Sequence, residues 1–361
     1  MDHKVLSVVV PMYQAEAYIE RCLDSFLVSE PKVLARVEIL VIDDGGTDGA
    51  AAIAQTYAEK YPDSYKVFRK ENGGHGSGIN YGIEHAKGTY FKVVDADDWV
   101  DTEAFGTLVK GLERLEGSKT DVDVVYTGFR WVLEGGQAER QGLVPERQGM
   151  KRTGSIFERR AESGEPFQSV VYGKLYSFDE VADCIYMKMH HMTIRTKILK
   201  EHAIRLDEHC YYVDMQFITF PIPYVKTICF LDESVYRYRI GVQGQSVAIK
   251  SMQRNEENYN RVIRSLLGFY SGLGTRIPCS EEKRRYIAAL IARMAAGKAK
   301  ILLSFPKADG RVREWRAFDE MLKAEYPAVY KANHNLALSL LRVTRYRLFD
   351  CLGVYVRRLY S

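Results

Sequence analysis

Short apolar runs alternate with helix-forming segments over residues 6–94, and this alternation limits the fold more than any other feature of the sequence. Runs of this length that are rich in Val and Ile are typical of buried parallel strands. Strands that alternate with helices predict a mostly parallel sheet with helices on both faces, so the expected fold class is α/β. The runs are residues 6–10, 37–42, 65–70 and 90–94, with helices expected at 17–27, 49–60 and 79–86.

Acidic residues follow two of these strands. Asp43 and Asp44 close the second run, and Asp95, Asp97 and Asp98 follow the fourth. Right-handed crossovers bring the carboxyl ends of parallel strands to one edge of the sheet, where α/β proteins bind ligands. Carboxylates clustered there need a neutralising partner, and hard divalent cations take oxygen ligands. Each acid also has a local explanation, as a turn residue or a helix cap, but local roles do not explain their recurrence at one edge.

A Gly-rich segment, residues 71–78, follows the third strand. It lacks the Gly-x-x-x-x-Gly-Lys-Ser/Thr pattern of a P-loop. The spacing of Gly74, Gly76 and Gly78 also differs from the Gly-x-Gly-x-x-Gly of dinucleotide-binding folds. Recognition of a diphosphate through carboxylates and a metal fits the segment better than either nucleotide motif.

Composition bounds the remaining possibilities. A chain of 361 residues suits one large domain or two, and no apolar run approaches the length of a membrane span. Six scattered cysteines without a Cys-x-x-Cys pair predict neither a zinc site nor a disulfide framework, which fits a reducing cytoplasm. The N-terminus leads straight into a strand, so we expect no signal peptide. Residues 331–361 carry six basic side chains and one acid, so the net +4 belongs to the tail and nucleic-acid binding is not expected.

Several motifs in order over about residues 5–105 resemble glycosyltransferase family 2. The resemblance implies a GT-A (nucleotide-diphospho-sugar transferase) fold and inverting transfer from an activated sugar. The segments that carry it are Ser7–Tyr13, Glu38–Asp48, Asn72–Gly74, Asn80–Ile83, Ala86–Gly88 and Val94–Asp98. Three positions depart from the family pattern: Gln14 stands for Asn, Gly46 for Ser, and Ile79 for the Arg that often precedes Asn80.

The resemblance also implies roles for individual residues. Pro11, Tyr13 and Asp44 would line the nucleobase and ribose pocket. Asp95 and Asp97 would form the Asp-x-Asp motif, with Asp97 or Asp98 on Mg²⁺ or Mn²⁺. The full set of candidate donor-binding residues is Pro11, Tyr13, Asp43, Asp44, Gly74, Asn80, Asp95 and Arg239, and the candidate metal ligands are Asp97 and Asp98.

Asp214 is the candidate catalytic base. It stands between aromatic and apolar residues before an expected helix, where its pKa would be raised. An inverting transfer needs one base to take the proton of the acceptor hydroxyl, and residues 213–217 resemble the family's acidic motif with Val213 in place of its first acid. The alternative for Asp214 is a helix N-cap. Arg237 and Arg239 share one face of an expected strand, where either guanidinium would stabilise a leaving UDP or lie at a solvated sheet edge.

The chain changes character after residue 250. Residues 1–250 are expected to form the catalytic domain, with 1–100 as its nucleotide-sugar half and 101–250 as its acceptor half; residues 251–361 form a helical C-terminal domain. Segment 134–165 is either an insertion or an acceptor-side element. The adjacent His190 and His191 would point apart on a strand, so a shared metal is not expected.

The tail is expected to be a basic amphipathic helix. Such a helix binds a membrane surface or a partner, or packs on its own domain. Its apolar stripe comprises Leu341, Leu348, Leu352, Tyr355 and Leu359.

These observations predict a cytoplasmic, metal-dependent, inverting glycosyltransferase, peripheral to the inner face of the membrane through its tail. It would move a sugar from a UDP-sugar to a hydroxyl of a glycan, glycolipid or glycoprotein acceptor. Two alternatives stay open. A nucleotidyltransferase predicts a basic Gly-rich loop after the first strand, where Pro11-Met-Tyr-Gln14 stands instead. A non-catalytic carbohydrate- or nucleotide-binding protein predicts lost acids, whereas Asp97 and Asp214 remain. The sugar, the linkage and the oligomeric state do not follow from the sequence.

Overall fold

The computed structural model describes residues 3–118, 121–133, 139–141, 170–241, 248–306 and 310–360. The described chain falls into two compact units, one up to residue 241 and one from residue 248. The predicted domain boundary at residue 250 stays a prediction. Apart from the strand at 139–141, segment 134–165 lies largely outside the described residues, as does the loop around Gln245 that follows Arg239.

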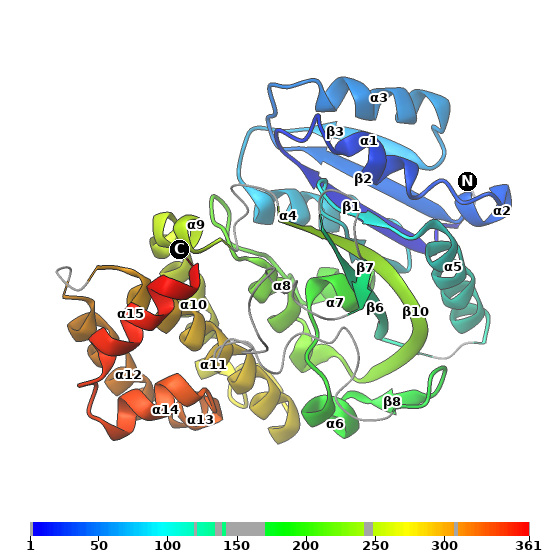
Figure 1. Ribbon diagram of the computed structural model, residues 1–361. Coiled ribbons are helices and arrows are strands. Elements are labelled where there is room, and N and C mark those ends of the chain that lie inside the picture. The colour runs from blue at the N-terminus through cyan, green and yellow to red at the C-terminus, as the bar shows by residue number, and fades with distance from the viewer. Residues whose placement is uncertain are drawn as a thin grey trace. The chain divides into compact units, whose positions relative to one another are not determined.

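A ten-stranded sheet forms the centre of the first unit within the described residues (Figure 1). Its main path runs β3-β2-β1-β4-β9-β6-β10-β5, with β7 beside β6 and β8 beside β10. Strands β3, β2, β1 and β4 are mutually parallel, and β9 joins β4 to β6 through two antiparallel pairings. The strands are β1 (Leu6–Met12), β2 (Val37–Asp43), β3 (Tyr65–Arg69), β4 (Tyr90–Val93), β5 (Trp99–Val100), β6 (Val124–Leu133), β7 (Glu139–Gln141), β8 (Leu175–Ser177), β9 (Met192–Arg195) and β10 (Thr227–Ile240).

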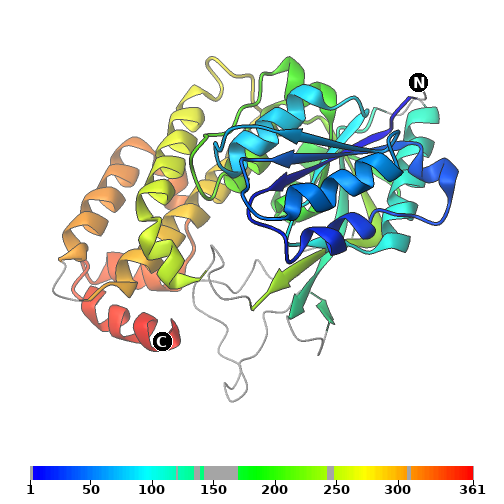
Figure 2. The same ribbon diagram turned by 90° about the horizontal axis from the view of Figure 1, so that it is seen from above.

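Helices cover both faces of the parallel strands. Figure 1 shows α1 and α3 on one side of β1–β3 and α4 on the other, and Figure 2 shows α1 and α3 lying across the first strands. The predicted α/β class and the four N-terminal strands are therefore confirmed. The helices of this unit are α1 (Ile19–Asp24), α2 (Pro31–Leu34), α3 (Ala50–Lys60), α4 (His75–His85), α5 (Thr102–Gly117), α6 (Phe178–Val181), α7 (Thr196–Glu201) and α8 (Asp214–Thr219), with short 3₁₀ turns at Ala182–Cys184, Met189–His191 and Ile222–Tyr224.

Alternate side chains of β1 serve the two faces. Val8 and Val10 are fully buried in the core beneath α1, α3 and α5, whereas Val9 points to α4. A Cβ built on Gly82 of α4 would lie 2.5 Å from the side chain of Val9. The glycine therefore lets α4 lie close against β1, at the edge of the sheet that carries the acids.

Helix α4 begins earlier than predicted. The glycines at 73–78 predicted a loop followed by a helix at Ile79, but the helix starts at His75. Close packing explains this, because a Cβ at Gly76 would lie 2.2 Å from the carbonyl oxygen of Asp207. The glycines thus allow close contact with the 206–213 segment rather than a flexible loop. This tertiary packing overrides their low helix propensity.

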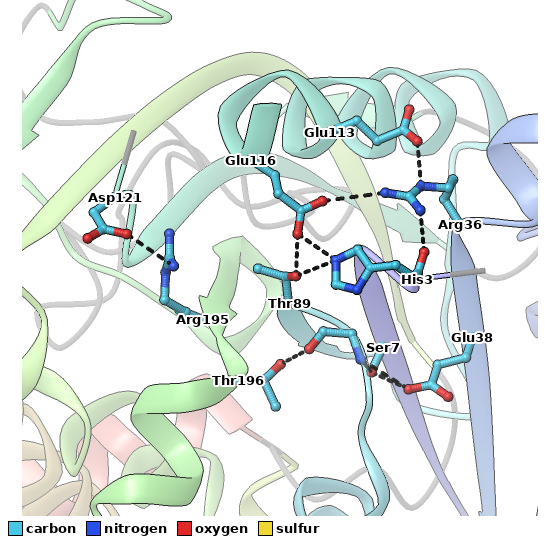
Figure 3. A network of polar contacts seen from close by, with 11 residues as sticks. His3, Ser7, Arg36, Glu38, Thr89, Glu113, Glu116, Asp121, Arg195 and Thr196 are labelled. Atoms are coloured by element: carbon cyan, nitrogen blue, oxygen red, sulfur yellow. Dashed lines mark hydrogen bonds and ion pairs between the residues drawn. The ribbon is translucent and has the colours of Figure 1, made fainter. Parts of the chain in front are cut away.

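A polar network ties the opposite, N-terminal ends of the strands together (Figure 3). The carboxylate of Glu116, at the end of α5, accepts hydrogen bonds from Thr89 Oγ1 (2.6 Å) and Arg36 Nη2 (3.4 Å), and lies 2.6 Å from His3 Nε2. Buried Glu38 accepts a hydrogen bond of 2.6 Å from Ser7 Oγ. Desolvation raises the pKa of Glu38, but the hydrogen bonds that its carboxylate accepts outweigh this effect and lower the pKa. These contacts fix β1, β2 and β4 at the end away from the acidic rim.

The second unit is helical, as predicted. Its core contains Trp315 and Leu338, both fully buried. Within the described residues, no helix combines the length and the apolar character that crossing a membrane requires. The helices are α9 (Ile249–Arg254), α10 (Glu256–Gly272), α11 (Glu281–Ser304), α12 (Arg311–Glu325), α13 (Pro327–Ala332), α14 (Leu336–Val343) and α15 (Phe349–Tyr360).

The prediction of one continuous amphipathic helix in the tail is wrong. The chain turns between α14 and α15, where Arg345 and Tyr346 adopt positive φ angles of 50° and 65°. Leu341, from the predicted stripe, is fully buried in the core of its own unit, and Leu352 packs against the same core. This part of the stripe is therefore ordinary packing.

A buried ion pair links α14 to α12. The carboxylate of Asp319 is fully buried and accepts hydrogen bonds from Arg342 Nη2 (2.8 Å) and Tyr346 Oη (3.0 Å). We expect Arg342→Met to lower the free energy of unfolding by about 3–5 kcal/mol, because it leaves a buried charge without its cation. Urea unfolding followed by circular dichroism measures this loss. The exposed Arg345→Met is the control, with an expected change within about 0.5 kcal/mol; equal effects of the two substitutions would refute the role of the pair.

Candidate active site

The acids predicted to share one rim do so. They follow β2 and β4, adjacent to β1 in the parallel part of the sheet, so Asp44 and Asp95 leave the sheet at the same edge. The loop before α4 and the end of β10 reach the same rim, through a hydrogen bond between His75 and Asp95 and one from the backbone of Arg239 to Asp98.

Asp44 organises the Gly-rich loop. Its carboxylate is 3% exposed and accepts hydrogen bonds from Lys70 Nζ (2.7 Å) and from the backbone N–H groups of Gly73 (3.0 Å) and Gly74 (2.7 Å). Gly74 has a φ of +81°, a conformation that L side chains rarely adopt. The Asp44 carboxylate therefore fixes the conformation of the loop, which leads directly into the N-terminus of α4.

Three further predicted donor-binding residues lie at the ends of β1 and β2. Pro11 is buried at the end of β1, and Tyr13 beyond it is 57% exposed. Asp43 is buried and accepts a hydrogen bond of 2.8 Å from the backbone N–H of Gly46. An exposed aromatic ring beside a rigid strand end is suited to stacking on a nucleobase.

Asn80 has a different environment from the one the resemblance implied. Its side chain is 3% exposed and its Nδ2 donates to the Leu206 carbonyl (3.0 Å) and to Glu208 Oε1 (3.1 Å). Its Oδ1 accepts from the Leu206 N–H (2.9 Å). The amide group thus joins α4 to the segment that leads to Asp214, and a direct donor contact stays a prediction.

Asp95 is paired with a histidine that sequence analysis did not single out. His75 Nε2 lies 2.7 Å from Asp95 Oδ1. Burial opposes a charged imidazole, but the carboxylates of Asp95, Asp214 and Asp97 outweigh it and raise the pKa of His75. Burial likewise opposes the charge of Asp95, but the pairing with His75 lowers its pKa. The acids around the first residue of α4 therefore favour the protonated form of its imidazole.

Asp98 faces inward. It is 1% exposed, and its carboxylate accepts hydrogen bonds from Tyr236 Oη (2.6 Å) and from the backbone N–H of Arg239 (2.8 Å). Burial, and then the charges of Asp97 and Asp95, raise the pKa of Asp98 well above its usual value. Asp98 therefore anchors β10 to the acidic loop.

Asp97 is the accessible acid of the three. Its side chain is 47% exposed and lies 3.9 Å from Arg239 Nη2. Burial and the charge of Asp95 raise the pKa of Asp97, against the opposing influence of Arg239. The guanidinium carbon of Arg239 lies 3.5 Å over the ring of Tyr18, which fixes the side chain at the rim. Arg237 is engaged elsewhere, donating to Asp101 (2.7 Å) at the start of α5.

A second missed histidine completes the donor set that a cation would need. Ligand atoms of Asp95, Asp98 and His190 all lie within 4.8 Å of one another. His190 Nδ1 is buried and has no hydrogen-bond partner among the described residues, and burial lowers the pKa of His190 to about 3, which keeps the ring neutral. The two carboxylates suit Mn²⁺ or Mg²⁺, and the neutral imidazole, a softer ligand, favours Mn²⁺ of the two. The residues present therefore fit a divalent cation.

The two adjacent histidines do separate, although on a 3₁₀ turn rather than a strand. His191 is 1% exposed, and its ring stacks on Tyr126 with 4.3 Å between centroids. His190 lies on the site side, next to Tyr236.

Asp214 is the first residue of α8, and Val213 rather than Asp214 occupies the N-cap position. Burial raises the pKa of Asp214, and the charge of Asp95 acts in the same direction against the effect of His75. The alternative interpretation as an N-cap is therefore wrong, whereas the raised pKa agrees with the expectation for a base. Asp214, His75 and Asp95 thus form one electrostatically coupled group.

The fold is of the GT-A type, that of nucleotide-diphospho-sugar transferases. Over 99% of this chain, the structure resembles the Staphylococcus aureus TarS fragment 1–349 in complex with UDP, with a TM-score of 0.60, 20% identity and 91% of that chain covered. It also resembles the mannosyltransferase PcManGT of Pyrobaculum calidifontis in complex with GDP-Man and Mn²⁺, with a TM-score of 0.53, 15% identity, and 99% and 86% of the two chains covered.

Residues 7–157 match the model of glycosyl transferase family 2, and this segment of the chain belongs to that family. It is 26% identical over 283 residues to EpsJ, an uncharacterised glycosyltransferase of Bacillus subtilis, and the match spans 78% of this chain and 74% of EpsJ. It is 25% identical over 283 residues to GgaB of the same organism, a minor teichoic acid biosynthesis protein, covering 77% of this chain and 27% of GgaB. The predicted family is confirmed, and the chain is a glycosyltransferase.

Proposed function

We propose that this glycosyltransferase uses a UDP-sugar with a divalent cation and transfers the sugar, with inversion, to a hydroxyl of a surface polysaccharide or teichoic-acid-like acceptor. The observation that carries the proposal is the gathering of Asp44, Asp97, His75 and Asp214 around one rim. The TarS complexes with UDP and UDP-GlcNAc support the choice of donor, and the printed name of GgaB supports the acceptor class.

In this proposal, the donor lies across the strand ends. The nucleobase stacks against Tyr13, and the loop held by Asp44 faces the ribose and diphosphate. Arg239, fixed over Tyr18, faces the diphosphate, because a guanidinium matches phosphate oxygens in shape and charge.

A bound divalent cation would offset charge on the diphosphate as it leaves. We propose that Asp95, Asp97, Asp98 and His190 hold it. His190 remains neutral because of its burial, so it is available as a ligand without losing a proton.

Asp214 is the proposed base. Its carboxylate takes the proton of the acceptor hydroxyl while the hydroxyl oxygen bonds to C1 of the sugar and the bond from C1 to the diphosphate breaks. The electron pair leaves with UDP, and attack opposite the leaving group inverts C1. The positive charge of His75 beside Asp95 moderates repulsion between the acids and the incoming diphosphate.

The donor class is tested by calorimetric titration of UDP, GDP and CDP into the protein, with and without Mn²⁺. Of the three nucleotides, we expect only UDP to bind with micromolar affinity, and at least about tenfold more tightly when Mn²⁺ is present, because a cation held by the carboxylates of the rim would offset the charge of the diphosphate. Equal binding of GDP would contradict the UDP assignment. A folded protein that binds none of the three would favour a non-catalytic protein of the same fold.

A further inference from the structure

Helix α14 carries apolar side chains on both of its faces. On its inner face, Leu338 and Leu341 are fully buried against the core that contains Trp315. This face accounts for the packing of the helix in its own unit. A helix with one covered face ordinarily presents polar side chains on the other.

The outer face of α14 is apolar instead. Leu336, Leu340 and Val343 are 63%, 42% and 84% exposed. Their spacing of four and three residues places them on one stripe of the helix. Single exposed apolar residues are common, but three large ones aligned on a helix of eight residues indicate a surface that is covered by something else.

Basic side chains continue this stripe. After α14 ends at Val343, the turn to α15 presents Arg345 and Arg347, both exposed. The two arginines, with Val343, Thr344 and Leu348, line a shallow depression at the end of the stripe. Among the described residues, neither guanidinium has a hydrogen-bond or ion-pair partner. A favourable interaction with the C-terminus of α14 explains cations at this position but not the apolar stripe beside them.

We propose that the outer face of α14 and the following turn, that is Leu336, Leu340, Val343, Arg345 and Arg347, form a docking surface for an anionic lipid bilayer. The apolar side chains enter the headgroup region while the arginines pair with lipid phosphates, as interfacial helices do. The surface lies within the second unit and does not depend on the proposed sugar-transfer chemistry.

Two other occupants fit the surface less well. A second copy of the chain in a two-fold contact would bring four unpaired arginines together, which opposes association. Another protein would need about 800 Å² on this side for a stable interface, whereas the patch offers three apolar side chains on two turns of helix.

Flotation of the full-length protein with lipid vesicles tests the proposal. The vesicles contain either phosphatidylcholine alone or phosphatidylcholine with about 30% phosphatidylglycerol, a fraction of the order found in strongly anionic membranes. We expect binding to the anionic vesicles only, reduced in 0.5 M salt, since exposed charges are screened there. Removing both charges in Arg345→Gln/Arg347→Gln should weaken binding about 25-fold, near fivefold for each arginine.

Control variants separate this surface from charge in general. Arg313→Gln/Lys323→Gln removes two exposed cations from α12 and should bind like the wild type. Leu340→Ser/Val343→Ser should weaken binding while leaving the circular dichroism spectrum unchanged, because both side chains are exposed. The proposal is overturned if the α12 variant loses as much vesicle binding as the Arg345/Arg347 variant. It is also overturned if neither the Arg345/Arg347 variant nor the Leu340/Val343 variant binds more weakly than the wild type. A dimer in light scattering that Val343→Ser disrupts, with no vesicle binding, overturns it as well.

Discussion

Asp214→Asn should reduce sugar transfer by about 10²–10⁴-fold while leaving UDP affinity in Mn²⁺ within about threefold of wild type, because the amide keeps the size of the carboxylate but cannot accept a proton. The residue starts α8, is half-buried and lies within electrostatic reach of Asp95 and His75. The readouts are release of UDP from the UDP-sugar that binds, with water or acceptor as the nucleophile, and calorimetric affinity for UDP.

The wild-type pH profile gives an independent check on Asp214. A base works only when ionised, and burial raises the pKa of this carboxyl. The rate should therefore fall as the pH is lowered, beginning above the range in which an exposed aspartate titrates. Glu208→Gln, on the same segment, is the control and should keep this profile. A fully active Asp214→Asn protein would exclude the base role without affecting the assignment of the donor.

Asp97→Asn is expected to abolish most of the Mn²⁺-dependent gain in UDP affinity, a loss of at least about tenfold for a direct ligand. Asp97 has an exposed carboxylate, whereas Asp98 is buried and also accepts hydrogen bonds from Tyr236 and from the backbone of Arg239. The measurement is calorimetric titration of UDP at several Mn²⁺ concentrations. Asp63→Asn, an exposed acid outside the rim, carries the same charge change and should bind UDP normally.

Asp97→Asn should also stabilise the protein in the absence of metal. Burial and the charge of Asp95 raise the pKa of Asp97, so its ionised form is disfavoured in the folded state. The destabilisation is present at neutral pH and is relieved as the pH falls through the raised pKa, and an asparagine removes it at any pH. A higher melting temperature for Asp97→Asn without Mn²⁺, together with weaker UDP binding, is the expected pair of results. Unchanged UDP affinity in Mn²⁺ would remove Asp97 from the metal site.

The sequence predicted the parallel half of the sheet well because the signal is local. Each strand is a short apolar run, and strand-helix alternation leaves few topologies. The position of the rim acids followed from this topology, so Asp44 and Asp95 could be placed together before any coordinates were known. The apolar neighbours of Asp214 in the sequence suggested a base, but its electrostatic interaction with Asp95 could not be predicted from them.

The two histidines of the site depend on long-range contacts and gave no such signal. His190 reaches Asp95 and Asp98 because β9, which follows it, pairs with β4 across about a hundred residues of chain. His75 was assigned to a loop because of the glycines around it, which hid the start of α4. A sequence rule that treated an isolated His inside the Gly-rich segment as a candidate partner for the strand-end acids would have found it.

The prediction of a continuous tail helix was wrong for another reason. Its apolar period continues from α14 into α15, but neither glycine nor proline marks the turn at residues 344–348. Arg345 and Tyr346 adopt left-handed conformations there, with the buried Asp319 accepting a hydrogen bond from the Tyr346 hydroxyl. Periodicity alone does not detect a break that is stabilised by tertiary contacts.

The support that Asp44 gives to the Gly-rich loop has a consequence for how specificity can change. The loop is already ordered by Lys70 and by the Asp44 carboxylate, so an arriving donor loses its own conformational entropy but imposes little on the backbone. In the proposed mode of binding, discrimination between nucleotides would depend on the fit of side chains such as exposed Tyr13 against a fixed backbone, as in a lock-and-key site. On this proposal, replacements around the base could alter the preferred nucleotide over evolutionary time without rebuilding the loop that faces the diphosphate.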